Sequence, residues 1–132
     1  WDFVHDEIGY NYRMPNINAA LMVAQLEQLD TFLKNKRELA GLYENHFGYT
    51  DIQFVKELEF SKSNYWLCAI LLKDKKSRDE FLQYTNDNGV MTRPVWRLMN
   101  KLVMFKDAMH GNLDNAEEIE NRLVNIPSSV RK

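Results

Sequence analysis

Apolar residues recur at helical spacing in the segment that follows Pro15. Proline suits the first position of a helix, asparagine is a good cap, and glycine often ends one. The pattern predicts one long amphipathic helix over residues 16–48, begun by Pro15 or Asn16 and ended at Gly48, with a break near Lys34–Arg37 as the alternative to a continuous helix. The apolar positions that carry the first part of this pattern are Ile17, Ala20, Leu21, Ala24, Leu26, Leu29 and Leu33.

Three later segments have the pattern of strands. Asp51–Val55 alternates between polar and apolar residues, and Tyr65–Leu72 is an almost continuous apolar run, typical of a central strand. Val90–Arg93 is the third strand, and Pro94 either ends it or places it at a sheet edge, because proline has no N–H to donate to a sheet.

The remaining pattern completes an α+β fold with about three strands in a mixed or antiparallel sheet and helices on one face. The chain is expected to be one domain, with a loop at 1–15, the linking helix at 16–48 and an α+β body at 49–132. The other expected elements are a helix at 77–88 capped by Ser77, loops or short turns at 96–105, a helix at 115–123 capped by Asp114, and an extended finish at 125–129.

The amino-acid composition and net charge exclude several classes of function. Hydrophobic residues make up 45% and charged residues 27% of the 132 residues, and the net charge is −2. This balance argues against bulk binding to nucleic acid or a membrane surface. No apolar run reaches the ~20 residues of a membrane-spanning helix, and Trp1–Asp6 does not resemble a secretory signal. A start at Trp1 without a methionine favours a piece of a longer protein, and the single Cys68 fits a reducing compartment, so we expect a cytoplasmic location.

Most catalytic constellations are missing from the pattern. His5, His46 and His110 lie far apart, with no ligand-type partner four residues away, so no metal site is expected. Cys68 lies in an apolar run, where a core thiol is the expected role. From these residues we therefore expect neither a metal site nor a nucleophile triad.

The sequence Tyr10-Asn11-Tyr12-Arg13 lies just before the long helix. An asparagine amide, a guanidinium and a helix N-terminus together suit a phosphate or carboxylate. The alternative is an ordinary loop, in which Arg13 pairs with Asp6 or Glu7 and the tyrosines pack the loop.

A second cluster consists of Arg93, Trp96 and Arg97, just after the third strand. Arginines beside an aromatic ring can hold an anionic ligand that carries a ring. The alternative is a surface loop with Trp96 buried. Neither cluster contains a carboxylate pair or an activated base, so neither specifies a reaction.

Longer blocks of the chain resemble a known family. Gly9–Leu21 (GYNYRMPNINAAL) and Ala24–Tyr43 (AQLEQLDTFLKNKRELAGLY) resemble the DegT/StrS-type sugar-nucleotide aminotransferases, which depend on pyridoxal 5'-phosphate. Gly89–Phe105 and Asn121–Val130 resemble later segments of the same family. At Pro94-Val95-Trp96 the chain departs from the common family pattern, in a way similar to the subgroup that makes 4-amino sugars for legionaminic-type nonulosonic acids.

The resemblance implies the small C-terminal domain of an aspartate-aminotransferase-like fold. The large N-terminal domain, with the lysine that binds the cofactor, is absent from this sequence, so the chain alone should be inactive. Asn11, with Arg13 and Tyr12, is implied to reach the cofactor phosphate of the other subunit in a homodimer formed through this loop and the long helix. The segment with Arg93, Trp96 and Arg97 is implied to line the sugar-nucleotide pocket.

Two hypotheses follow. In the first, the complete protein transfers an amino group, from glutamate, to a keto sugar nucleotide for bacterial surface polysaccharide or nonulosonic acid. In the second, the chain is a non-catalytic binding or dimerisation module.

Overall fold

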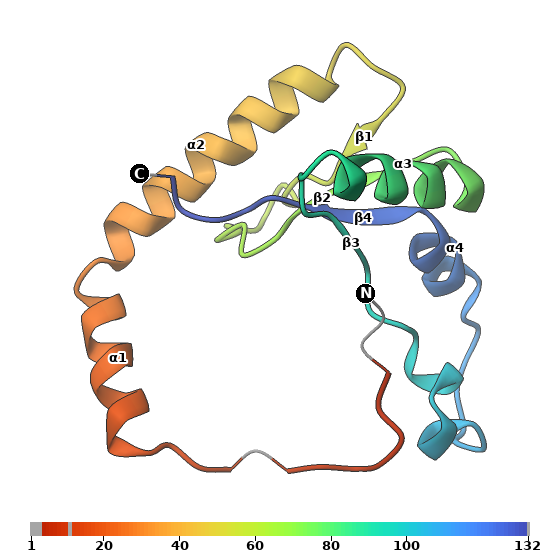
Figure 1. The fold of residues 1–132 in the computed structure, drawn as a ribbon, viewed down its shortest axis with the longest axis horizontal. Coiled ribbons are helices and arrows are strands. Elements are labelled where there is room, and N and C mark those ends of the chain that lie inside the picture. The colour runs from red at the N-terminus through yellow and green to blue at the C-terminus, as the bar shows by residue number, and fades with distance from the viewer. Residues whose placement is uncertain (1–3, 11, 132) are drawn as a thin grey trace.

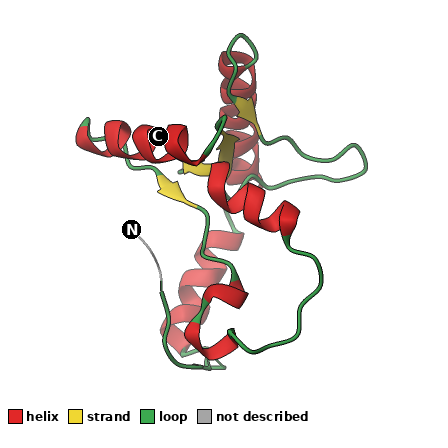
Figure 2. Ribbon diagram, turned by 90° about the vertical axis from the view of Figure 1, so that its right-hand side faces the viewer, coloured by secondary structure: helices red, strands yellow, loops and turns green. Residues whose placement is uncertain are grey.

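The chain folds as an α+β unit, in agreement with the prediction. A computed structural model describes residues 4–10 and 12–131. Much of the chain outside the helices is loop around a small sheet (Figure 1; Figure 2). The elements are α1 (Asn16–Leu26), α2 (Leu29–Phe47), β1 (Gln53–Phe54), β2 (Cys68–Leu71), α3 (Lys75–Asp87), β3 (Arg93–Pro94), the 3-10 turns η1 (Met99–Lys101) and η2 (Val103–Phe105), α4 (Asp114–Arg122) and β4 (Leu123–Ile126).

The sheet is antiparallel and has the strand order β1-β2-β4-β3. Four strands are present where about three were expected, because the chain from Leu123 onward pairs along the whole of β2. Pro94 lies in the edge strand β3, so the predicted edge position of this proline is confirmed. Since β4 lies between β2 and β3, the last strand joins segments that are distant in sequence.

One face of the sheet carries the core. Ile70 pairs with Val124, and both side chains are fully buried. Ala40 of α2 and Leu82 of α3 pack into the same cluster, so these two helices cover this face. Cys68 also belongs to the cluster, and burial raises the pKa of its thiol. A protonated thiol in an apolar core agrees with the predicted role of this cysteine.

The predicted long helix is two helices. The break lies at residues 27–28, and α2 is continuous through the region near Lys34–Arg37, where a break had been considered. At the break the side-chain amide of Gln28 donates to the Ala24 carbonyl (3.3 Å), while the Gln28 backbone N–H donates to Gln25 (3.1 Å). The side chain thus occupies the carbonyl that the helical backbone would use, which favours a turn.

Helix α1 has no buried residue and lies apart from the sheet, beyond α2 (Figure 1). Its exposed apolar side chains are Ile17, Leu21, Met22, Val23 and Leu26. Among the described residues, no helix is long and apolar enough to cross a membrane.

The third strand and two caps differ from the prediction. Val90–Thr92 does not enter the sheet, because it is tied to α3: the Val90 N–H donates to the Thr85 carbonyl (2.8 Å), and the Thr85 and Thr92 hydroxyls lie 2.6 Å apart. Asp74, not Ser77, caps α3 by accepting the Ser77 N–H (2.8 Å). Asp114, the predicted cap of the last helix, is the first residue of α4, which has no side-chain cap; the Asn112 side chain accepts the Asp114 N–H (2.9 Å) in the turn before it.

Candidate functional site

A cavity of about 490 Å³ brings together residues from α2, the start of β2, the segment after β3 and the end of β4. Arg93 and Asn125 pair across β3 and β4, so both lie on the sheet face opposite to Ile70 and Val124. The side chains that give this cavity its chemical character are Lys36, Trp66, Arg93, Trp96, Arg97 and Asn125.

The cavity is cationic. Lys36, Arg93 and Arg97 line it, and no Asp or Glu is among its described lining residues. The net charge of the whole chain is −2, so this local excess of cations does not follow from composition. Such a lining favours an anionic ligand.

Two tryptophans give the cavity an aromatic wall. The rings of Trp66 and Trp96 are stacked, with centroids 6.1 Å apart and an interplanar angle of 22°. Trp66 is 65% exposed and Trp96 is 50% exposed. Trp96 is therefore not the buried residue of the alternative reading, and each ring retains open surface.

The backbone before Trp66 is unusual. Tyr65 has a φ of 45°, the only positive φ of a non-glycine residue in the described chain. Cys68 and Ile70 face the core, so continued alternation would turn Trp66 to the core as well. The alternation does not extend to Trp66, because Trp66 and Leu67 form a bend before β2 begins at Cys68. Tyr65 packs against the core and Trp66 faces outward.

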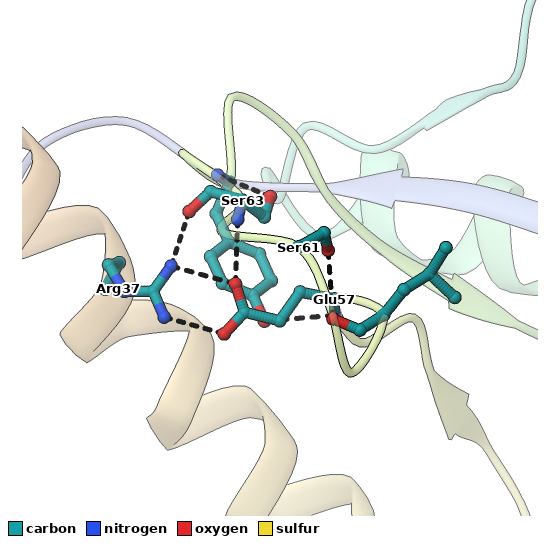
Figure 3. A network of polar contacts seen from close by, with 6 residues as sticks. Arg37, Glu57, Ser61 and Ser63 are labelled. Atoms are coloured by element: carbon teal, nitrogen blue, oxygen red, sulfur yellow. Dashed lines mark hydrogen bonds and ion pairs between the residues drawn. The ribbon is translucent and has the colours of Figure 1, made fainter.

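A charged clamp holds the loop that leads to Tyr65 (Figure 3). Arg37 of α2 forms two hydrogen bonds to the Glu57 carboxylate (2.7 and 3.0 Å) and also donates to the Ser63 carbonyl. The Ser63 N–H donates to Glu57 (2.7 Å), and the Ser63 hydroxyl accepts the Tyr65 N–H (3.0 Å). The Arg37 guanidinium lies 5.7 Å from the centroid of the Tyr65 ring. The hydrogen bonds from Arg37 and Ser63 lower the pKa of Glu57 to about 2.

Lys36 fixes the cavity from the helix side. Its ammonium group donates to the backbone carbonyls of Trp66 (3.3 Å) and Ser128. The Trp66 N–H in turn donates to the Asn64 side chain (2.9 Å). Lys36 therefore links α2, the Trp66 segment and the chain end after β4.

The N-terminal loop forms a second candidate site, apart from the cavity. Asn11 lies outside the described residues. Tyr12 and Arg13 are exposed, and Tyr12 stacks on Tyr10 with 5.7 Å between centroids. Within the described chain Arg13 has no ion pair with Asp6 or Glu7, so the alternative in which it is paired there does not hold.

The start of α1 suits a phosphate group. Among the described residues no side chain caps its first N–H groups, and its first turn contains no acidic residue. A helix N-terminus with free N–H groups and a nearby arginine is a favourable environment for an anion. The residues present thus fit the phosphate of a cofactor.

Trp66 and Lys36 were not identified from the sequence. Trp66 lies within the predicted strand Tyr65–Leu72, but β2 begins only at Cys68, and Trp66 lies in the bend before it. The polar cluster Ser61–Asn64 directly before it was the available signal that the strand begins later. The predicted residues Arg93, Trp96 and Arg97 do line one cavity, whereas Tyr12 and Arg13 are not among its described lining residues.

Comparison with known proteins assigns the family. The sequence matches the DegT/DnrJ/EryC1/StrS aminotransferase family over residues 1–131. The chain belongs to this family. A GDP-perosamine synthase of Escherichia coli O157:H7 is 37% identical over 124 residues, which are 94% of this chain and 34% of that protein. A GDP-perosamine synthase of Vibrio cholerae is 32% identical over 127 residues, 94% of this chain and 35% of that protein.

The fold comparison agrees. Helicobacter pylori PseC, an aminotransferase involved in the biosynthesis of pseudoaminic acid, superimposes with a TM-score of 0.80 at 20% identity, over 99% of this chain and 37% of that chain. The chain spans about a third of the length of the curated relatives that it matches. These relatives do not single out the legionaminic-type subgroup suggested by Pro94-Val95-Trp96.

The clamp leads to a prediction for stability. Glu57→Gln should lower the thermal unfolding midpoint at neutral pH, because the charged hydrogen bonds with Arg37 are lost. The Glu57 pKa falls from its ordinary 4.5 to about 2 on folding, so its contribution is complete above about pH 4.5 and is lost as the pH falls toward 2. The difference between variant and wild type should shrink over this window in circular dichroism melts.

Glu59→Gln is the matched control, since Glu59 is an exposed carboxylate of the same loop. It should melt like the wild type at each pH. A Glu57→Gln deficit that stays constant from neutral pH to pH 2 would contradict the clamp.

Proposed function

We propose that the complete protein is a pyridoxal-phosphate-dependent aminotransferase that transfers an amino group, from glutamate, to a keto sugar nucleotide. This chain forms its C-terminal third. The single observation in the chain that carries the proposal is the acid-free, cationic cavity with an aromatic wall. A sugar nucleotide combines a diphosphate with a flat base, and this lining complements both parts.

For the substrate we propose a 4-keto sugar nucleotide used in bacterial surface polysaccharide or nonulosonic acid. Support comes from the GDP-perosamine synthases, which match across 94% of the chain. A UDP-4-amino-4,6-dideoxy-N-acetyl-beta-L-altrosamine transaminase of Campylobacter jejuni matches over only 54% of it. A GDP-linked sugar is therefore our preferred substrate over a UDP-linked one.

The N-terminal loop is proposed to hold the cofactor phosphate of a partner subunit through Asn11 and Arg13, with Tyr12 beside them. The free N–H groups at the start of α1 support this assignment. When bound, pyridoxal phosphate supplies the chemistry that carries the amino group, and the lysine to which it attaches lies outside this chain. The chain's own residues bind and orient the phosphate and the substrate.

A homodimer through this loop and α1 is proposed for the same reason. Apolar side chains on α1 are exposed along its length, and none is buried within the chain. Exposed apolar patches of this kind are typical of surfaces covered by another body. A dimer places the phosphate donors of one subunit at the cofactor of the other.

Two alternatives give different outcomes in one assay. A family relative from Yersinia pseudotuberculosis, 29% identical over 85% of the chain, is a GDP-4-keto-6-deoxy-D-mannose 3-dehydratase, so the family includes a second reaction. The other alternative is a non-catalytic binding or dimerisation module.

The complete protein should transfer the amino group of ¹⁵N-glutamate to GDP-4-keto-6-deoxy-D-mannose, as measured by mass spectrometry of the sugar nucleotide. Loss of water without gain of nitrogen would indicate the dehydratase, and no reaction would support the module. The 132-residue chain alone should show no turnover and should retain no covalent cofactor after borohydride reduction. A retained adduct on a lysine of this chain would overturn the proposed division of the site.

Asn11→Ala in the complete protein should weaken cofactor binding by about 1.5–3 kcal/mol, the range for a hydrogen bond to a charged group. The measurement is cofactor release in equilibrium dialysis, followed by absorbance. Asn45→Ala is the control, since Asn45 is an exposed asparagine of α2. Equal cofactor affinity in the two variants would remove Asn11 from the site.

Leu21→Glu should shift the complete protein from dimer toward monomer in sedimentation velocity, because it places a charge on the exposed apolar surface of α1. Met109→Glu is the control, since Met109 is fully exposed in a loop distant from α1. A Leu21→Glu protein that remains dimeric at wild-type concentrations would exclude α1 from the interface.

A further inference from the structure

Trp66 and Trp96 form an exposed pair of indole rings on one wall of the cavity. Their packing within the chain does not explain this exposure. Tryptophan is a large apolar side chain that is highly buried on average. Here Trp66 and Trp96 touch each other, yet at least half of each side chain remains exposed. Each therefore offers surface to a flat partner.

We propose that Trp66 and Trp96 form the stacking surface for the base of a nucleoside diphosphate, and that Arg97 binds its phosphates. The proposal rests on the proposed function, because it assigns the nucleotide end of the sugar-nucleotide substrate to this cavity. Trp66 is the new residue in it and acts as a specificity determinant.

The backbone at Tyr65 supports a functional role for Trp66. A bulky residue with positive φ costs on the order of 1–3 kcal/mol and persists only where its surroundings enforce it. Arg37, Glu57 and Ser63 hold the loop before Tyr65 in this form, and Trp66 and Leu67 then form a bend before β2 begins at Cys68. The fold thus maintains a strained residue directly before the bend that carries the exposed indole.

The charges around the indoles select the ligand. Arg97 is exposed and makes no ion pair or hydrogen bond with another described residue, and Lys36 is anchored to two carbonyls at the cavity wall. No carboxylate is among the described lining residues, so a diphosphate meets only cations there. An amino-acid donor such as glutamate has no ring that could stack on the two tryptophans, whereas a nucleotide has a flat base that can.

A neighbouring cavity of similar size has a different lining. It has a similar volume of about 480 Å³ and also contains Arg97, but Asp79 and Glu120 line it and no aromatic side chain is among its described residues. Only the first of these two combines cations with exposed rings. Its volume lies within the range of about 300–1,000 Å³ that is usual for small-molecule sites.

The test is a titration of the complete protein with GDP, followed by tryptophan fluorescence. A base stacked on Trp66 and Trp96 should quench the part of the signal that comes from these two residues. Trp66→Ala should weaken GDP binding about tenfold or more, and Trp66→Phe should restore most of it, since an aromatic ring suffices for stacking. Calorimetry provides the affinity where the mutated signal is weak.

Inorganic pyrophosphate, which has no base, separates the two roles. Trp66→Ala should leave pyrophosphate affinity unchanged, whereas Arg97→Gln should weaken both pyrophosphate and GDP. Tyr84→Ala removes an exposed aromatic ring of α3 that does not line the cavity, and it should change neither affinity. Circular dichroism melts show whether each variant remains folded.

Equal GDP affinity in wild type and a folded Trp66→Ala variant overturns the proposal, and so does an equal loss for GDP and pyrophosphate. In the complete enzyme, Trp66→Ala should raise KM for the sugar nucleotide and leave KM for glutamate unchanged. If the enzyme transfers amino groups but this variant keeps its KM, the stacking proposal fails and the function stands. If the chain binds GDP through Trp66 but the complete protein transfers no amino group, the proposed function fails instead.

Discussion

The antiparallel pairing of β2 with β4 is the interaction on which the rest of the structure depends. In this pairing Cys68 lies opposite Ile126 and Ile70 lies opposite Val124, and these side chains form the centre of the core. The other two strands each pair with only one of these, β1 with β2 and β3 with β4. The tail after β4 binds both α2 and β2: the Tyr43 hydroxyl of α2 donates to the Pro127 carbonyl (2.9 Å), and the Cys68 N–H of β2 donates to the Ser128 hydroxyl (2.7 Å).

Elements with a strong periodic pattern could be predicted from the sequence. Tyr65–Leu72 contains β2, and the helix expected at residues 77–88 contains most of α3, because burial imposes a pattern that neighbouring residues must share. The fold class and the edge position of Pro94 follow from the same kind of reasoning. The division of the long helix does not, because it depends on whether one amide, that of Gln28, bonds to the Ala24 carbonyl or to water.

The candidate site likewise has one part that could be predicted from the sequence and one that could not. Arg93, Trp96 and Arg97 are close in sequence, so a local cluster of cations and an aromatic ring was visible without a structure. Trp66 joins them only through the strand order and through the bend at residues 66–67 before β2, and neither is encoded in a local pattern. Residues that meet across a sheet, with a left-handed residue between strand and loop, are therefore the part that sequence reasoning misses.

The position of β4 has a consequence for synthesis. Strands β2 and β3 are complete by residue 94, but they do not pair with each other, and β4, the strand that lies between them, is made after both. A chain emerges from the ribosome at roughly 5–20 residues per second, N-terminal part first. Until residues 123–126 emerge, the two tryptophans belong to separate, unjoined segments. The aromatic wall of the cavity is therefore assembled only after residues 123–126 have been made, and a chain truncated before β4 lacks it altogether.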